Sequence, residues 1–214
     1  IYTLGLRGNI DPASQADLTK QFLNARAEFR DRLTDPDIAA LVEGFDPGKY
    51  NENATLGENL LFGTPVGDAF DMDNLAQNKY VISVLESQGL IDDLLDAGQQ
   101  IASTMTELFA DLPAGHPFFE QFSFISSDDL PEFQAVLTRI NRDGVGTLRP
   151  EERTMILSLP FKISPARHRL GIIDEQLQDR ILVARKAFAE NLPEEYRGGI
   201  EFFDVDGFNT AATL

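Results

Sequence analysis

A stretch of fourteen residues that occurs twice constrains this chain more than any other feature of its sequence. The first copy, residues 43–56, reads EGFDPGKYNENATL, and the second, residues 201–214, reads EFFDVDGFNTAATL. At an offset of 158 residues, seven of the fourteen positions are identical. The first copy runs on into residues 57–63, GENLLFG, whereas the sequence ends with the second. We therefore expect a fragment of a longer protein.

An amphipathic helix is predicted before each copy. Apolar residues follow the same spacing of three and four in both places: Leu18, Phe22, Ala25, Phe29 and Leu33, and then Leu177, Ile181, Ala184, Phe188 and Leu192. This spacing places them on one face of an α-helix. An Ala-Arg pair, Ala25-Arg26 and Ala184-Arg185, recurs inside both stripes. The repeated unit is therefore a helix followed by the fourteen-residue tail.

Each repeat helix is also preceded by an aspartate, Asp11 in Gly8-Asn9-Ile10-Asp11 and Asp174 in Gly171-Ile172-Ile173-Asp174. Aspartate is a favoured N-cap because its carboxylate accepts hydrogen bonds from the first free amides of a helix. Pro12 suits the first helical position. We predict that Asp11 and Asp174 cap the two repeat helices.

Apolar periodicity predicts helices through most of the remaining chain. The marker residues are Leu75, Ile82 and Leu85 for one helix, Ile101, Met105, Leu108 and Leu112 for a second, Leu130, Phe133, Leu137 and Ile140 for a third, and Met155, Ile156 and Leu159 for a short fourth. Helix ends are expected at Gly89, Gly98, Pro113, Pro160 and Pro193.

Short strands are expected only at residues 1–6 and 200–203. The predicted fold class is therefore all-α, mainly helical with at most short marginal strands. We predict one helical unit with three segments. These are a first repeat arm at residues 1–63, a central helical insert at 64–162, and a second, truncated arm at 163–214.

The composition excludes several classes of protein. Without cysteine, the chain has no disulfide scaffold and no thiolate metal site. No apolar run approaches the roughly 20 residues of a membrane span, so direct membrane insertion is not expected. A formal net charge of −17 argues against nucleic acid as a partner, because phosphates would be repelled. The acidic surface serves either solubility or the docking of a basic partner.

Residues 116–124, HPFFEQFSF, form the densest apolar segment. Four phenylalanines supply much buried area from few residues, so this segment is expected to be core of the central insert. The alternative is a binding patch for a partner.

Residues 141–152, NRDGVGTLRPEE, resemble an EF-hand calcium loop, with oxygen ligands at Asn141, Asp143 and Glu152. Val145 stands at the fifth position and offers no side-chain oxygen, and calcium requires six to eight oxygens. We predict a Gly-rich turn between helices and no tight calcium site.

No self-contained active site is predicted, so the catalytic and metal residues are none. The two histidines, His116 and His168, are too isolated to build a triad or a His-x-x-x-His metal site. The chain has no phosphate-binding Gly-x-x-x-x-Gly-Lys-Ser/Thr motif.

Residues 53–63, NATLGENLLFG, resemble the segment after the Q-loop in ATP-binding cassette (ABC) transporter ATPases. Seven residues match that family's pattern in register: Thr55, Leu56, Glu58, Asn59, Leu60, Phe62 and Gly63. Residues 81–98 are similar to the family's helical subdomain, and the resemblance ends where the Leu-Ser-Gly-Gly-Gln signature would follow.

This resemblance implies a non-catalytic segment of an ABC transporter ATPase, inserted between the Q-loop and signature regions. Such a segment couples ATP-driven motion to the membrane domains or regulates it. The expected partners are those membrane domains and the rest of the nucleotide-binding domain, and the candidate contacts are Thr55, Glu58 and Asn59. The fragment itself is expected to hold no cofactor.

ATP and Mg²⁺ would be bound elsewhere in the parent protein, which would lie in the cytoplasm at the inner face of the cell membrane. Capping of a helix is the alternative role for Thr55. The alternative function is an independent helical protein-interaction module that carries a degenerate EF-hand-like loop.

Overall fold

Helices make up most of the protein, and the prediction of a mainly helical fold with short marginal strands is confirmed. The computed structural model describes residues 10–33, 35–39, 44–110, 112, 116 and 125–211. The elements are α2 (Ala16–Arg32), α3 (Pro36–Ala39), α4 (Leu56–Leu61), β1 (Gly63–Pro65), the 3-10 turn η1 (Leu75–Gln77), α5 (Lys79–Ser87), α6 (Ile91–Phe109), α8 (Leu130–Asp143), η2 (Val145–Thr147), α9 (Pro150–Phe161), α10 (Pro165–His168), α11 (Glu175–Glu190), η3 (Glu194–Tyr196) and β2 (Ile200–Phe202). Among the described helices, none combines the length and apolarity that crossing a bilayer requires.

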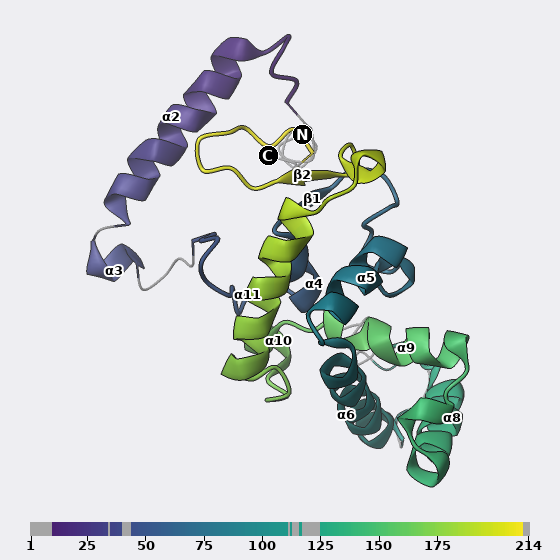
Figure 1. Ribbon diagram of the computed structural model, residues 1–214. Helices are drawn as coiled ribbons and strands as arrows, with labels where there is room; N and C mark the ends of the chain where they lie inside the picture. The colour runs from purple at the N-terminus through teal and green to yellow at the C-terminus, as the bar shows by residue number, and fades with distance from the viewer. Residues whose placement is uncertain are drawn as a thin grey trace.

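The second repeat helix, α11, packs against α4 in the middle of the molecule (Figure 1). The Asp174 carboxylate accepts a 2.8 Å hydrogen bond from the Leu177 amide, which confirms the predicted N-cap. The first four residues of the predicted stripe are buried: Leu177, Ile181, Ala184 and Phe188. On the α4 side, they face a helix whose Leu56, Leu60 and Leu61 are fully buried.

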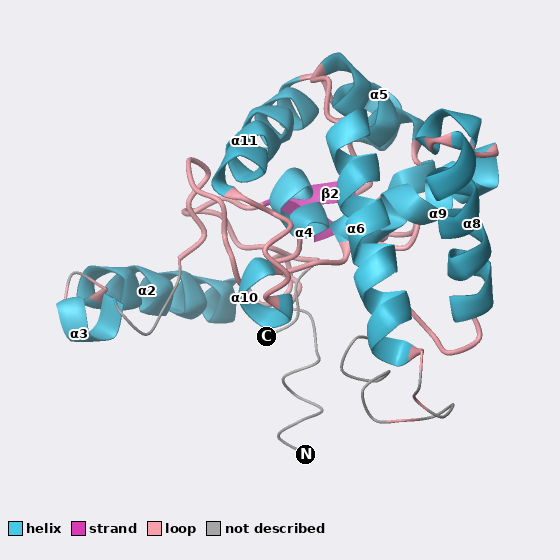
Figure 2. Ribbon diagram, turned by 90° about the horizontal axis from the view of Figure 1, so that it is seen from below, coloured by secondary structure: helices cyan, strands magenta, loops and turns pink. Residues whose placement is uncertain are grey.

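The first repeat helix, α2, differs from α11 in both its cap and its burial. The prediction that Asp11 caps it is wrong, because α2 begins at Ala16, and the Asp11 carboxylate instead accepts from the Ala13 amide in the preceding turn. The stripe residues Leu18, Phe22 and Phe29 are 36%, 41% and 48% exposed. In Figure 2, α2 and α3 project to one side, away from α5, α6, α8 and α9.

The helix expected over Leu75–Leu85 is divided into η1 and α5, because the Asn78 side chain caps α5 by accepting from the amides of Tyr80 and Val81. Gly89, at φ 65°, adopts the left-handed conformation that turns the chain after α5. The stop predicted at Gly89 therefore agrees with the structure.

The stop predicted at Gly98 is wrong, because α6 runs through it to Phe109. A Cβ atom at Gly98 would lie 2.2 Å from the Ile156 carbonyl oxygen of α9, so glycine is there to let two helix backbones touch. Pro160 lies inside the last turn of α9, which ends one residue later at Phe161.

Within residues 64–162, α6 packs against both α8 and α9 (Figure 1). The apolar faces are buried as predicted at Ile101 and Met105 of α6 and at Phe133, Leu137 and Ile140 of α8, whereas Leu108 is exposed. The chain returns from α9 to the start of α4, where the Leu56 amide donates to the Ile163 carbonyl.

Two short strands join the repeat arms. The expected strand at residues 200–203 is β2, and it pairs antiparallel with β1 in the register Gly63↔Phe202, Thr64↔Glu201 and Pro65↔Ile200. The sequence did not predict β1. A Cβ atom at Gly63 would lie 2.7 Å from the Glu201 carbonyl oxygen, so the strands approach more closely than a side chain permits.

Three sequence-based predictions fall outside the described residues. These are the strand expected at residues 1–6, the helix end expected at Pro113, and most of the aromatic segment, residues 117–124.

Candidate functional site

Thr55 and Glu58 form a reciprocal capping box at the start of α4. The Glu58 amide donates to Thr55 Oγ1 at 3.1 Å, and the Thr55 amide donates to Glu58 Oε2 at 2.7 Å. The capping role weighed for Thr55 is thus what the structure shows. Glu58 is exposed and Thr55 is half-buried, so this turn presents a fixed carboxylate at the surface.

The third predicted contact residue, Asn59, lies inside the protein at 2% exposure. Its Nδ2 donates to the carbonyls of Asn51 and Thr55 at 2.9 and 3.0 Å. Its Oδ1 accepts from the Asn51 amide and from Arg185, both at 2.9 Å. The side-chain amide of Asn59 therefore fastens the first tail to α4. Of the three predicted contact residues, Thr55 and Glu58 reach the surface.

Arg185 of α11 binds this junction from the other side. It is 5% exposed, and Nε donates to the Asn59 carbonyl at 2.6 Å. Nη1 donates to the carbonyls of Lys49 and Pro47 at 3.1 and 3.0 Å. Burial lowers the pKa of the guanidinium to about 10, so it remains charged at neutral pH. One side chain thus joins α11, α4 and the first tail.

An aromatic cluster extends this junction to β1 and β2. The Arg185 guanidinium carbon lies 4.4 Å from the ring centre of Phe62, a cation–π contact. The Phe62 and Phe203 ring centres are 5.5 Å apart at an interplanar angle of 87°. Phe45 and Phe203, which occupy the same position in the two tails, have ring centres 4.6 Å apart. The two tails therefore meet each other at equivalent residues.

Two hollows adjoin the first turn of α4. The larger, about 770 Å³, is lined by residues that include Phe45, Glu58 and Phe203. The second, about 520 Å³, also reaches Glu58 and is bordered by Lys162 and Arg167. Glu58 is common to both, so a segment in either hollow would lie against its carboxylate.

The basic residues on the second hollow are held by local contacts. The Lys162 ammonium pairs with Asp73 at 2.5 Å. His168 Nδ1 accepts from the Ser164 amide at 3.0 Å, and burial lowers the pKa of the imidazole. His168, the last residue of α10, thus contacts Ser164, the residue that caps the same helix.

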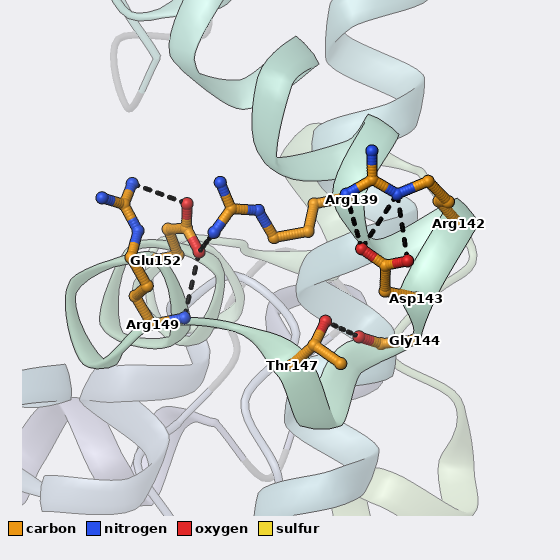
Figure 3. Close-up of polar contacts among 7 residues, drawn as sticks. All are labelled: Arg139, Arg142, Asp143, Gly144, Thr147, Arg149 and Glu152. Atoms are coloured by element: carbon orange, nitrogen blue, oxygen red, sulfur yellow. Dashed lines mark hydrogen bonds and ion pairs between the residues drawn. The ribbon is translucent and has the colours of Figure 1, made fainter.

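The residues of the EF-hand-like loop do not converge on one point (Figure 3). Asp143 lies in the last turn of α8, where Arg142 binds its carboxylate at 2.7 Å. The Glu152 carboxylate, 4% exposed, accepts from the Arg149 side chain at 2.7 Å, the Arg149 amide at 3.0 Å and Arg139 at 3.2 Å. Within the described residues, no cluster of three or more His, Cys, Asp or Glu could hold a metal ion.

We expect Glu152→Gln to lower the melting temperature at pH 7, because it removes a buried carboxylate bound by two arginines. The Arg149 hydrogen bond lowers the pKa of Glu152 below 4.5. A lowered carboxyl pKa stabilises the native state above the unfolded pKa, so the difference from the wild type should shrink as pH falls below about 4.5. Glu151→Gln, in the same turn but exposed, is the control.

Calcium titration by calorimetry tests whether residues 141–152 are only a turn between helices or a calcium-binding loop. We expect no saturable heat with the wild-type chain. Saturable binding that disappears in Glu152→Gln would contradict this and favour a calcium-binding module.

Tyr50 offers a second test of the site, because its buried hydroxyl makes no hydrogen bond of good geometry in the described structure, although Asn59 and Arg185 lie near it. Tyr50→Phe should leave the melting temperature unchanged or raise it, since no bond is lost and a polar group is removed from the interior. The control is Tyr80→Phe, which removes a 2.6 Å hydrogen bond to the Phe188 carbonyl and should cost about 1 kcal/mol. A marked loss in Tyr50→Phe would reveal a partner for that hydroxyl.

Comparisons of the chain with protein-family models, with curated proteins and with solved structures each found no match.

The sequence analysis missed Arg185 and Phe62 as the centre of the junction. One signal was present in the sequence: the Ala-Arg pair that recurs inside both stripes, Ala25-Arg26 and Ala184-Arg185. Of the two arginines, Arg185 is buried and Arg26 is exposed, so the pair marked the position without showing which copy forms the junction.

Proposed function

We propose that the chain is a non-catalytic segment of an ABC transporter ATPase, inserted between the Q-loop and signature regions. It couples ATP-driven motion to the membrane domains or regulates it. ATP and Mg²⁺ are bound by other parts of the parent protein, which lies in the cytoplasm at the inner face of the cell membrane. The proposal begins from the register of residues 53–63 described above.

The observation that supports it most is the construction of the first turn of α4. Glu58 is exposed beside two hollows, while Asn59 in the same turn is buried and fastened to Arg185. The capping box with Thr55 holds the Glu58 carboxylate in place. A surface group supported in this way can transmit a force, because it cannot yield without moving the helix behind it.

Movement of α4 would reach the rest of the chain through two contacts. α11 packs along α4, and β1 follows it directly and pairs with β2. α4 also contacts α9, the last helix of the central insert. A membrane domain bound at Glu58 would thus act on both repeat arms and on the insert.

The gene on both sides of the chain provides the first test. We expect a Gly-x-x-x-x-Gly-Lys-Ser/Thr motif upstream of residue 1 and a Leu-Ser-Gly-Gly-Gln motif downstream of residue 214. Start and stop codons immediately at these two positions would refute the proposal.

A photo-crosslinking amino acid at position 58 of the parent transporter tests the contact itself. We expect it to crosslink to a membrane subunit, because Glu58 is exposed beside the hollows. The control is position 132, also exposed but on α8 of the insert. Equal crosslinking from both positions, or none from position 58, would contradict a contact at α4.

A further inference from the structure

The two repeat helices make the same contact with opposite tails. Arg185 of α11 donates to the Lys49 carbonyl in the first tail at 3.1 Å. Arg26 of α2, the equivalent arginine, donates at 2.8 Å to the carbonyl of Gly207, which is the residue equivalent to Lys49 in the second tail. Figure 1 shows α2 alongside the loop that follows β2.

An ion pair supports this arrangement, since Arg30 of α2 lies 3.8 Å from Asp206. The contact between the equivalent rings of Phe45 and Phe203 lies between the two tails. The contacts Arg26–Gly207 and Arg185–Lys49 join equivalent residues of the two repeats. The α2–second tail pair is in this respect a counterpart of the α11–first tail pair.

In the described structure, the α2–second tail pair has no helix that corresponds to α4. Arg185 also binds the Asn59 carbonyl and side chain and stacks on Phe62. Asn59 belongs to α4, and Phe62 is the C-cap of that helix. Arg26 has a carbonyl of the second tail as its described hydrogen-bond partner.

The apolar stripes show the same difference. On α11, Ile181 and Phe188 are fully buried; α4 packs along this helix, and the Phe188 ring lies against Phe70, Tyr80 and Phe202. Their equivalents on α2, Phe22 and Phe29, are 41% and 48% exposed. Large apolar residues grouped on one helix face are characteristic of an interaction surface. On α11, part of the equivalent surface is covered by α4, a short helix with the pattern Leu-x-x-Asn-Leu-Leu-Phe.

We propose that α2 and the second tail, residues 203–211, form a docking seat for a short helix of the α4 type. Its leucines cover Leu18 and Phe22, and its asparagine and phenylalanine complete the coordination of Arg26. In the sequence, α4 follows the first tail directly. The occupant proposed for the seat is therefore a helix joined directly to the end of the second tail. The inference rests on the repeat and its contacts, and it does not depend on the transport function.

The experiment adds an α4-type helix to the chain and tests whether it binds α2. The full chain is extended behind Leu214 with a second copy of its own residues 57–65, GENLLFGTP. Joining the helix to the tail gives it a high effective concentration at the seat. Hydrogen exchange of the α2 amides is measured with and without the extension, and we expect it to slow by about tenfold or more because α2 becomes part of a packed unit.

Two variants of α2 distinguish docking at the seat from a general effect of the extension. Phe22→Asp and Arg26→Ala should each abolish the added protection, since one places a charge in the seat and the other removes the polar anchor. Asn24→Asp is the matched control, an exposed position that lies outside the stripe, and it should retain the protection. An extension in which the asparagine and both leucines are replaced by serine should give none.

Each other outcome overturns the proposal. Unchanged α2 exchange in the extended chain would show that no α4-type helix binds there. Protection that survives Phe22→Asp would place the added helix elsewhere. Sedimentation that shows the unextended chain as a dimer, and as a monomer with Phe22→Asp, would assign the stripe to a second copy of the chain.

Discussion

Arg185→Ala is expected to lower the free energy of unfolding by about 3–5 kcal/mol, one of the two largest effects anticipated for a single substitution. The change removes the donor to the buried Asn59 carbonyl, and a buried unsatisfied acceptor costs about 1–3 kcal/mol. The bond to Asn59 Oδ1 and the bonds to the part-buried carbonyls of Lys49 and Pro47 are lost as well. It also removes the cation–π contact with Phe62. For a chain of this size, the melting temperature should fall by about 6–15 °C.

The repeat supplies the matched control for this prediction. Arg26→Ala removes the equivalent arginine from α2, where the side chain is exposed and donates to Gly207 alone among the bonds described. We expect that loss to be about 0.5 kcal/mol or less. Urea unfolding of both variants provides the comparison, and equal losses would contradict the central position of Arg185.

Gly98→Ala should destabilise the protein by about 2 kcal/mol or more, although alanine is favoured over glycine in a helix by roughly 1 kcal/mol. The added Cβ atom would lie 2.2 Å from the Ile156 carbonyl oxygen and 2.9 Å from its carbonyl carbon. Both contacts are with backbone, so α6 and α9 must separate to accommodate the methyl group. Separation would weaken the packing of the central insert as a whole.

Gly146→Ala is the control for Gly98→Ala, because a Cβ atom at Gly146 would meet no atom within 4 Å. We expect its melting temperature to stay within about 2 °C of the wild type. If Gly98→Ala proved as stable as Gly146→Ala, the close contact between α6 and α9 would be wrong.

The sequence predicted best those features that depend on local spacing. The Asp174 cap, the buried stripe of α11 and the turn at Gly89 all follow from residues within one or two helical turns. The identical spacing before the first tail did not lead to burial, because burial also requires a partner surface. Periodicity gives the face of α2 that can be buried, but not what covers it.

The features that the sequence did not predict depend on distant contacts. From the sequence, Gly98 is interpreted as a helix stop, and its actual role is evident only from its contact with Ile156 of α9. β1 contains Pro65 and only three residues, so it is recognisable as a strand only when paired with β2. For the candidate site, the motif at residues 53–63 indicated the correct turn, but Asn59 and Arg185 bind each other across 126 positions of sequence.

The contact between Gly98 and Ile156 also has a consequence for how the chain tolerates change in length. Gly98 lies within α6 and Ile156 within α9, so two points 58 residues apart in the chain are in contact. The entropy of closing a flexible loop rises only slowly with the number of residues in it. We therefore expect small changes in the number of residues between α6 and α8 to leave α4, α11 and the two tails in place.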